Sequence, residues 1–162
     1  MRRLVLGLCA LAFGYGAAMS GAAAQAPVQA GTLICDVSAG IGMIIASQKA
    51  VQCTFAPAPQ APAMPAELYS GNIKKFGLDI GATSAGQMVW AVYAPTNVIG
   101  PGSLAGVYAG ATAEATVAVG LGANVLIGGS NRTVALQPLS ITGQTGLNVA
   151  AGVASLELRP GP

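Results

Sequence analysis

The strongest constraint on the fold is a run of two-residue alternation between residues 112 and 127. The odd-numbered positions from Ala113 to Ile127 are all apolar, and the even-numbered ones are small or polar except for Leu126. A period of two places the apolar side chains on one face of an extended strand. Because this run exceeds an average strand, it predicts one long bent strand, or two strands that meet near residues 120–122, where glycines permit a bulge.

Shorter segments of strand-like composition cover much of the remaining chain. They are rich in apolar and β-branched residues, and turns containing Gly, Ser or Pro separate them. A helix competes only over the Ala-rich residues 105–118, where Gly106 and Gly110 weaken it. This pattern predicts an all-β fold, either an antiparallel β-sandwich or a small β-barrel, with Trp90 in the core. The expected strands are residues 31–37, 41–46, 50–55, 67–74, 76–81, 87–94, 112–127, 133–142 and 147–159.

The first 24 residues have the features of a secretory signal peptide. Arg2 and Arg3 precede an apolar stretch, and Ala22 and Ala24 provide an A-x-A cleavage site. Cleavage there would place the mature protein in the periplasm or outer envelope of a Gram-negative bacterium, or in the medium. The predicted organisation is a signal peptide, residues 1–24, and a single exported all-β domain, residues 25–162, with a Pro-rich surface loop at residues 56–65.

Cysteine usage agrees with export. Removal of the signal peptide takes Cys9 with it and leaves the pair Cys35 and Cys53. A cysteine pair in an oxidising compartment indicates a disulfide. The bond would join the first and third of the expected strands, residues 31–37 and 50–55. The turns between these strands are residues 38–40 and 47–49. Closing a loop of this size stabilises the fold by about 3 kcal/mol in the chain-entropy model.

The charge balance limits the choice of partner. Since Arg2 and Arg3 leave with the signal peptide, the five remaining basic residues match the five acidic ones. A neutral domain lacks the basic surface on which nucleic acids and anionic membranes depend, so no nucleic-acid partner is expected. Only 7% of residues are charged and 53% are hydrophobic. The outer surface is therefore built from small polar side chains, or part of it contacts something apolar.

Candidate catalytic groups are few. The chain has no histidine, which rules out a Ser–His–Asp triad and removes the commonest metal ligand. No metal or cofactor is expected; the glycines at 120 and 122 lack the third glycine of a dinucleotide motif. The candidate functional polar residues are Asp79, Glu114 and Arg132. Asp79 and Glu114 lie on the small-residue faces of their strands and could pair as glycosidase-type carboxylates, or be solvated or paired with a basic residue.

Beyond residue 30 the chain carries a set of longer motifs: Gly31-x-Leu33-x-Cys35, Cys53-x-Phe55, Phe76-Gly77-Leu78-Asp79-Ile80-Gly81, Val89-Trp90-Ala91-Val92, Ala113-Glu114-Ala115, Gly122-Ala123-Asn124-Val125-Leu126-Ile127-Gly128-Gly129-Ser130 and Leu136-Gln137-Pro138-Leu139. Together they resemble the bacterial domain-of-unknown-function family 992. The resemblance spans nearly the whole mature chain and implies a short exported protein of alphaproteobacterial type, with no catalytic residues to transfer. A fainter similarity to SYLF-type lipid-binding domains runs through residues 76–81, 88–93 and 111–120.

Three functions are compatible with these observations. The first is a non-catalytic binding or structural domain of the cell envelope that contacts lipid, envelope polymer or a protein partner. The second is a small outer-membrane β-barrel, because such a barrel is exported and its strands also alternate between apolar and polar residues. The third is a carboxylate-dependent hydrolase that uses Asp79 and Glu114. Because a long alternating strand can also pair between chains, a homo-oligomer is left open.

Overall fold

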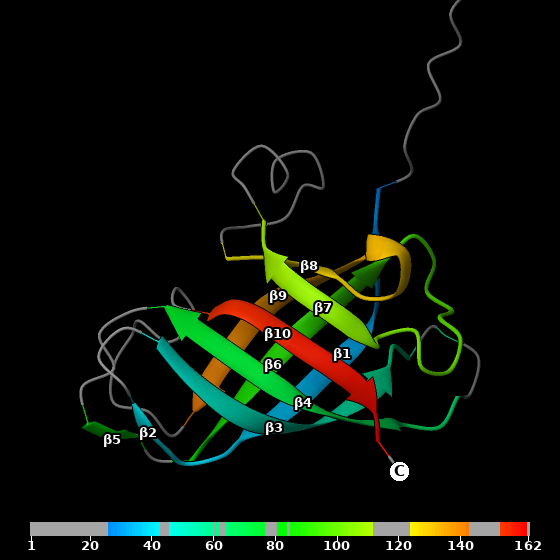
Figure 1. Ribbon diagram of the computed structural model, residues 1–162. Helices are drawn as coiled ribbons and strands as arrows, with labels where there is room; N and C mark the ends of the chain where they lie inside the picture. Colours follow the sequence, from blue (N-terminus) through cyan, green and yellow to red (C-terminus); the bar gives the residue numbers. More distant parts are fainter. Residues whose placement is uncertain are drawn as a thin grey trace, which may run out of the picture.

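The computed structural model describes residues 26–42, 46–59, 61, 64–76, 81–83, 85–111, 124–142 and 153–161. These residues form β-strands and one short 3-10 helix, as Figure 1 shows. In chain order the elements are β1 Val28–Val37, β2 Gly40–Gly42, β3 Ala46–Pro57, β4 Glu67–Phe76, β5 Gly81–Thr83, β6 Gly86–Ala94, β7 Gly106–Gly110, β8 Leu126–Gly128, η1 Ser130–Arg132, β9 Val134–Thr142 and β10 Val153–Pro160.

Eight of the strands close into an antiparallel barrel in the order β1-β3-β4-β10-β7-β8-β9-β6, with β6 pairing back to β1. The all-β prediction is confirmed, and of its two architectures the barrel is the one that forms. The order contains two Greek keys, β6-β1-β3-β4 and β10-β7-β8-β9, because in each the fourth strand returns beside the first. The short strands β2 and β5 form a separate two-stranded sheet.

The two ends of the barrel are distinguished by strand direction. At the first, named here the Leu104 end, β1 begins and β6 and β10 end. The loop between β6 and β7 lies there, and its Leu104 is fully buried in the core. At the second, named the Lys49 end, β1 ends and β6 begins, as the pairing of Val37 with Gly86 shows. The chain passes from β1 through β2 to β3 at this second end.

Most of the expected strands agree with the structure, with shifts at their boundaries. The expected strand at 41–46 divides between β2 and the start of β3, and β3 begins at Ala46 rather than at residue 50. The Pro-rich loop also starts later than expected, because Ala56 and Pro57 still pair with β1. Residues 77–80, 112–123 and 143–152 lie outside the described residues, so the long alternating run is represented by β8 alone.

The strand β7 was not expected. The sequence offered a competing helix over residues 105–118, and the part of it seen in the structure, Gly106–Gly110, is extended and pairs with both β10 and β8. Tyr108 on this strand is fully buried. A five-residue strand bounded by two glycines carries too few alternating positions for its period to be recognised.

The barrel interior is filled by one inward-facing row of side chains from each strand. On β6 the row is Met88, Trp90, Val92 and Ala94, each at most 2% exposed, which confirms the core position expected for Trp90. An eight-stranded barrel is just wide enough for side chains to fill it. The buried hydrophobic side chains form one cluster inside this wall. Burying them supplies most of the stabilisation of the fold.

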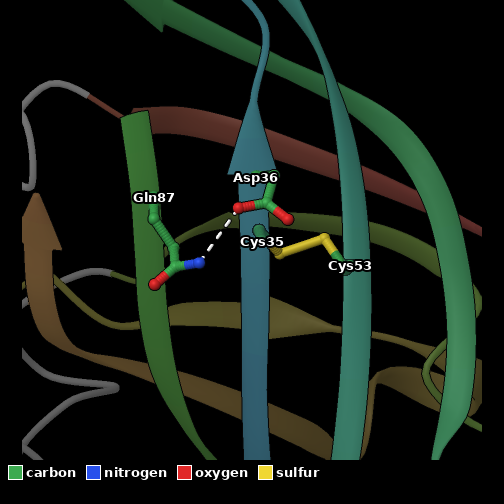
Figure 2. The surroundings of a disulfide bond; sticks show 4 residues. All are labelled: Cys35, Asp36, Cys53 and Gln87. Atoms are coloured by element: carbon green, nitrogen blue, oxygen red, sulfur yellow. Dashed lines mark hydrogen bonds between the residues drawn. A yellow bond between two sulfur atoms is a disulfide. The ribbon is translucent and has the colours of Figure 1, made fainter. Parts of the chain in front are cut away.

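The disulfide lies inside this core. Cys35 on β1 stands directly opposite Cys53 on β3, with a Cα–Cα distance of 4.0 Å. Both cysteines face inward and are at most 2% exposed, so the predicted bond is confirmed. Figure 2 shows it joining the two strands, while Asp36 accepts a hydrogen bond of 3.0 Å from the side-chain amide of Gln87 on β6. Covalent and polar contacts thus tie three neighbouring strands together at one level.

Gly71 permits the close contact between β4 and β10. It pairs with Val51 on one side and with Leu158 on the other. A Cβ atom at this position would collide with the backbone carbonyl oxygen of Glu157. Moving these backbone atoms aside strains the ladder that joins the two Greek keys, so any side chain at this position is destabilising.

Replacing Gly71 by alanine is therefore expected to lower the free energy of unfolding by about 1–3 kcal/mol, the usual cost of overpacking. The matched control is Gly110→Ala on β7, where no atom lies within 4 Å of the added Cβ. That variant should stay within about 0.5 kcal/mol of the parent. Urea unfolding followed by circular dichroism measures both. Equal effects of the two substitutions would contradict the close approach at Gly71.

Candidate functional site

The candidate polar residues named from the sequence fall in different places. Asp79 and Glu114 lie outside the described residues. Arg132 is the last residue of η1, between β8 and β9, where it is exposed and has a positive φ of 57°. The structure therefore places Arg132 on a surface turn. Among the described residues, a salt bridge of 2.6 Å joins Arg159 and Glu157 on β10.

The most unusual polar group of the described chain is Lys49, which sequence reasoning assigned to a turn. It lies on β3, in the same inward-facing row as Val51, Cys53 and Phe55, and its cross-strand partner on β4 is Ile73. Lys49 is 3% exposed, and its Nζ atom is buried without a hydrogen-bond partner. Among the residues whose burial is described, it is the one charged side chain in the core.

The position of Lys49 follows from the strand boundary. Once β3 begins at Ala46, the period of two places residues 49, 51, 53 and 55 on one face. The sequence contained this signal, because Lys49, Val51, Cys53 and Phe55 follow one another at intervals of two residues. A strand that begins at residue 50 leaves Lys49 outside this row. An amine on the apolar face of a strand is energetically costly, since burying a charge without a partner forfeits its hydration.

A second buried donor in the barrel is also unpartnered. The indole Nε1 of Trp90 has no hydrogen-bond partner, and Trp90 is fully buried. Trp90 stands opposite Leu33 on β1, which in turn stands opposite Phe55 on β3. Phe55 is six residues from Lys49, about 20 Å along the strand. The two donors therefore belong to different levels of the barrel, with Trp90 in the filled middle and Lys49 toward one end.

A network of buried tyrosines occupies the Leu104 end. The hydroxyl of Tyr69 donates a hydrogen bond to Oε2 of Glu67, and the same oxygen accepts the backbone N–H of Gly102 at 3.1 Å. The hydroxyl of Tyr108 donates to the backbone oxygen of Leu104 at 2.9 Å. These bonds attach the loop between β6 and β7 to the barrel wall. We interpret this cluster as structural, because its bonds to Gly102 and Leu104 hold that loop in place.

Burial raises the pKa of both tyrosines. Desolvation is the largest cause for Tyr69, followed by its hydrogen bond to Glu67. For Tyr108, desolvation comes first and the proximity of Tyr69 second. In each case the pKa lies well above the usual tyrosine range, so both hydroxyls keep their protons in the folded state at alkaline pH.

The described part of the chain has neither a metal-binding cluster nor a helix that could span a membrane. No group of three or more His, Cys, Asp or Glu side chains in it is arranged to hold a metal ion. Within the same residues, none of the helices reaches the length and apolar character needed to cross a bilayer.

The fold defines a class of protein, the small closed antiparallel barrel built from two Greek keys. Comparison of the sequence with family models places the chain more narrowly. The model described as "Protein of unknown function (DUF992)" matches residues 15–159, and the chain belongs to this family. The comparisons do not show the similarity to SYLF-type domains. No curated protein and no solved structure matches the chain.

The cost of the unpartnered amine is directly measurable. Replacing Lys49 by methionine keeps the length of the side chain and removes the buried charge, so the free energy of unfolding should rise by about 1–3 kcal/mol. The control is Lys74→Met on β4, an exposed lysine whose cross-strand partner is Gln48; its effect should stay within about 0.5 kcal/mol. Urea unfolding of both variants tests this. A lower stability of Lys49→Met would mean that the amine makes a favourable contact.

The raised tyrosine pKa values predict alkaline destabilisation. The unfolded chain releases its tyrosine protons near pH 10, while folded Tyr69 and Tyr108 retain theirs. The contribution of the two tyrosines to the free energy of unfolding is therefore fully present below about pH 10. Above that pH it falls by about 1.4 kcal/mol per pH unit for each tyrosine. Unfolding midpoints measured between pH 8 and pH 12 test this. Tyr69→Phe and Tyr108→Phe should each reduce the slope, and an unchanged slope in both would contradict the assignment.

Proposed function

We propose that this protein is an exported domain of the bacterial cell envelope that acts by binding rather than by catalysis. The observation that carries the proposal is the disulfide between Cys35 and Cys53, which lies inside the barrel core. Disulfides form and persist in oxidising compartments and are rare in the cytosol. The signal-peptide pattern of residues 1–24 supports the same location independently.

The polarity of the barrel wall supports a domain that is surrounded by water. On β3 the outward-facing residues Gln48, Gln52 and Thr54 are exposed, and on β10 Arg159 is exposed. Outer-membrane barrels have the reverse pattern, with an apolar band outside and a polar interior. This contrast favours the binding domain over the outer-membrane alternative.

The exposed large hydrophobic side chains of the wall do not alter this preference. Val28, Leu68, Val107 and Leu139 lie on β1, β4, β7 and β9, four different strands. Single exposed apolar residues are ordinary features of soluble protein surfaces. They do not amount to the continuous band that a bilayer requires.

Two features favour binding over catalysis. The chain lacks histidine, the commonest general base. Among the described residues, Lys49 is the charged side chain in the barrel core, and the tyrosine hydroxyls there already donate hydrogen bonds within the protein. The chemistry that this core offers is therefore the recognition of an oxygen acceptor by an amine. The hydrolase alternative depends on Asp79 and Glu114, and no observation on the described residues favours it.

Native fractionation combined with thiol labelling tests the proposal. The mature protein should begin at Gln25, appear in the soluble periplasmic fraction, and react with maleimide only after reduction. Cys9 provides an internal control, because an uncleaved chain retains this free thiol and is labelled without reduction.

Two results would contradict this location. Recovery of a cleaved protein in salt-washed membranes, with heat-modifiable migration on a denaturing gel, would favour the outer-membrane alternative. An uncleaved, reduced protein in the cytoplasm would overturn export itself.

A further inference from the structure

We propose that Lys49 is the anchor of a binding site for the acidic head group of an amphiphile, a molecule with one anionic oxygen group on an apolar body. This inference rests on the proposed binding function and names its ligand class. It starts from the Nζ atom of Lys49, which has no hydrogen-bond partner. The residue is only 3% exposed. Such a group is retained at a cost in stability, which binding would recover.

The donor chemistry fixes the head group. A lysine ammonium has three N–H donors and no acceptor, so its complement is an oxygen acceptor, and a charged one for a buried cation. The described acidic residues do not meet this need. Asp36 is exposed and bound to Gln87, and Glu157 is paired with Arg159. The third, Glu67, lies at the Leu104 end with Tyr69.

The surroundings of Lys49 fix the body of the ligand. Its cross-strand partner on β4 is Ile73, which is fully buried, and the next inward residue on β3 is Val51. Val51 stands opposite Val37 on β1, and Ile73 stands opposite Leu156 on β10. These side chains contain no hydrogen-bonding atoms. A fully hydrated inorganic anion would lose its water here without gaining further donors, whereas an apolar chain packs against such neighbours favourably.

Lys49 lies toward one end of the barrel and not in its packed middle. Val37 is the last residue of β1 and pairs with Val51. Lys49 is therefore one inward position beyond the end of β1, toward the Lys49 end. The large rings that fill the middle, Trp90 and Phe55, are paired through Leu33 at a level several residues deeper. A head group that meets the amine at this end leaves that packed middle in place.

Calorimetric titration of the processed, oxidised protein tests the proposal with defined probes. Palmitate and 1-palmitoyl lysophosphatidate present a carboxylate and a phosphate on the same alkyl chain. Hexadecanol lacks the charge, and acetate and inorganic phosphate lack the chain. At least one of the two acidic amphiphiles should bind at least about tenfold more tightly than hexadecanol, because only the acidic probes place a charged oxygen on the amine. Which one binds identifies the source of the anion.

Variants make the test specific to the amine. Lys49→Met should weaken binding of the acidic amphiphile by about tenfold or more, while Lys49→Arg keeps the charge and should bind more tightly than Lys49→Met. Lys74→Met, the exposed lysine on β4, should leave the affinity unchanged. Lys49→Met is expected to fold, because it removes a buried charge. Its circular dichroism spectrum and intact disulfide confirm this before the titration.

Three results would overturn the inference. The first is equal affinity of Lys49→Met and the parent protein, and the second is no binding of either acidic amphiphile. The third is saturation by acetate or phosphate at the affinity of the long-chain probes, which would remove the need for an apolar body. Either failure in a protein that is processed, oxidised and periplasmic leaves the proposed export intact. A protein that is uncleaved and reduced in the cell contradicts the proposed function whatever it binds.

Discussion

The structure depends on one constraint, the narrow interior of an eight-stranded barrel. Each strand contributes a single inward row, so the rows must fill the space completely with side chains that need no water. Trp90, Tyr69, Tyr108 and Phe55 are the largest fully buried side chains, and the disulfide joins two adjacent rows. Where a tyrosine hydroxyl enters this interior, a carboxylate or a backbone carbonyl accepts its hydrogen bond. The indole Nε1 of Trp90 and the amine of Lys49 have no such partner. Of these two, the amine lies toward an end of the barrel, and it is therefore the focus of the functional proposal.

Closure of the barrel distributes stability over the whole chain. The two Greek keys meet at two places, where β6 pairs with β9 and where β10 pairs with β4. These two strand pairs are the seams of the barrel. Both seams join residues that are far apart in sequence, such as Val92 with Leu136 and Leu158 with Gly71. Neither half can bury its inner face alone. The disulfide restricts only the first key, within the β1–β3 pair, and leaves the seams to packing and backbone hydrogen bonds.

The local features were readable from the sequence, and the global ones were not. Alternation in residues 31–37 and 87–94 identified β1 and β6, and the cysteine pair identified a bond that the structure contains. A period of two, however, gives the faces of a strand and not its neighbours, so sandwich and barrel remained equal alternatives. Lys49 was missed because a strand boundary four residues too late removed it from its inner row. Asp79 and Glu114 were attractive as a pair because both are carboxylates, yet strand parity carries no distance between them.

The central claim is that Lys49 faces into an apolar barrel. Amine acylation of the folded, oxidised protein, followed by peptide mass spectrometry, measures this most directly, because Lys74 on the adjacent strand provides an exposed reference. The account predicts that Lys74 is modified rapidly in the folded protein, that Lys49 is modified far more slowly, and that unfolding in urea brings the two rates together. Modification of Lys49 at the rate of Lys74 in the folded protein would contradict it.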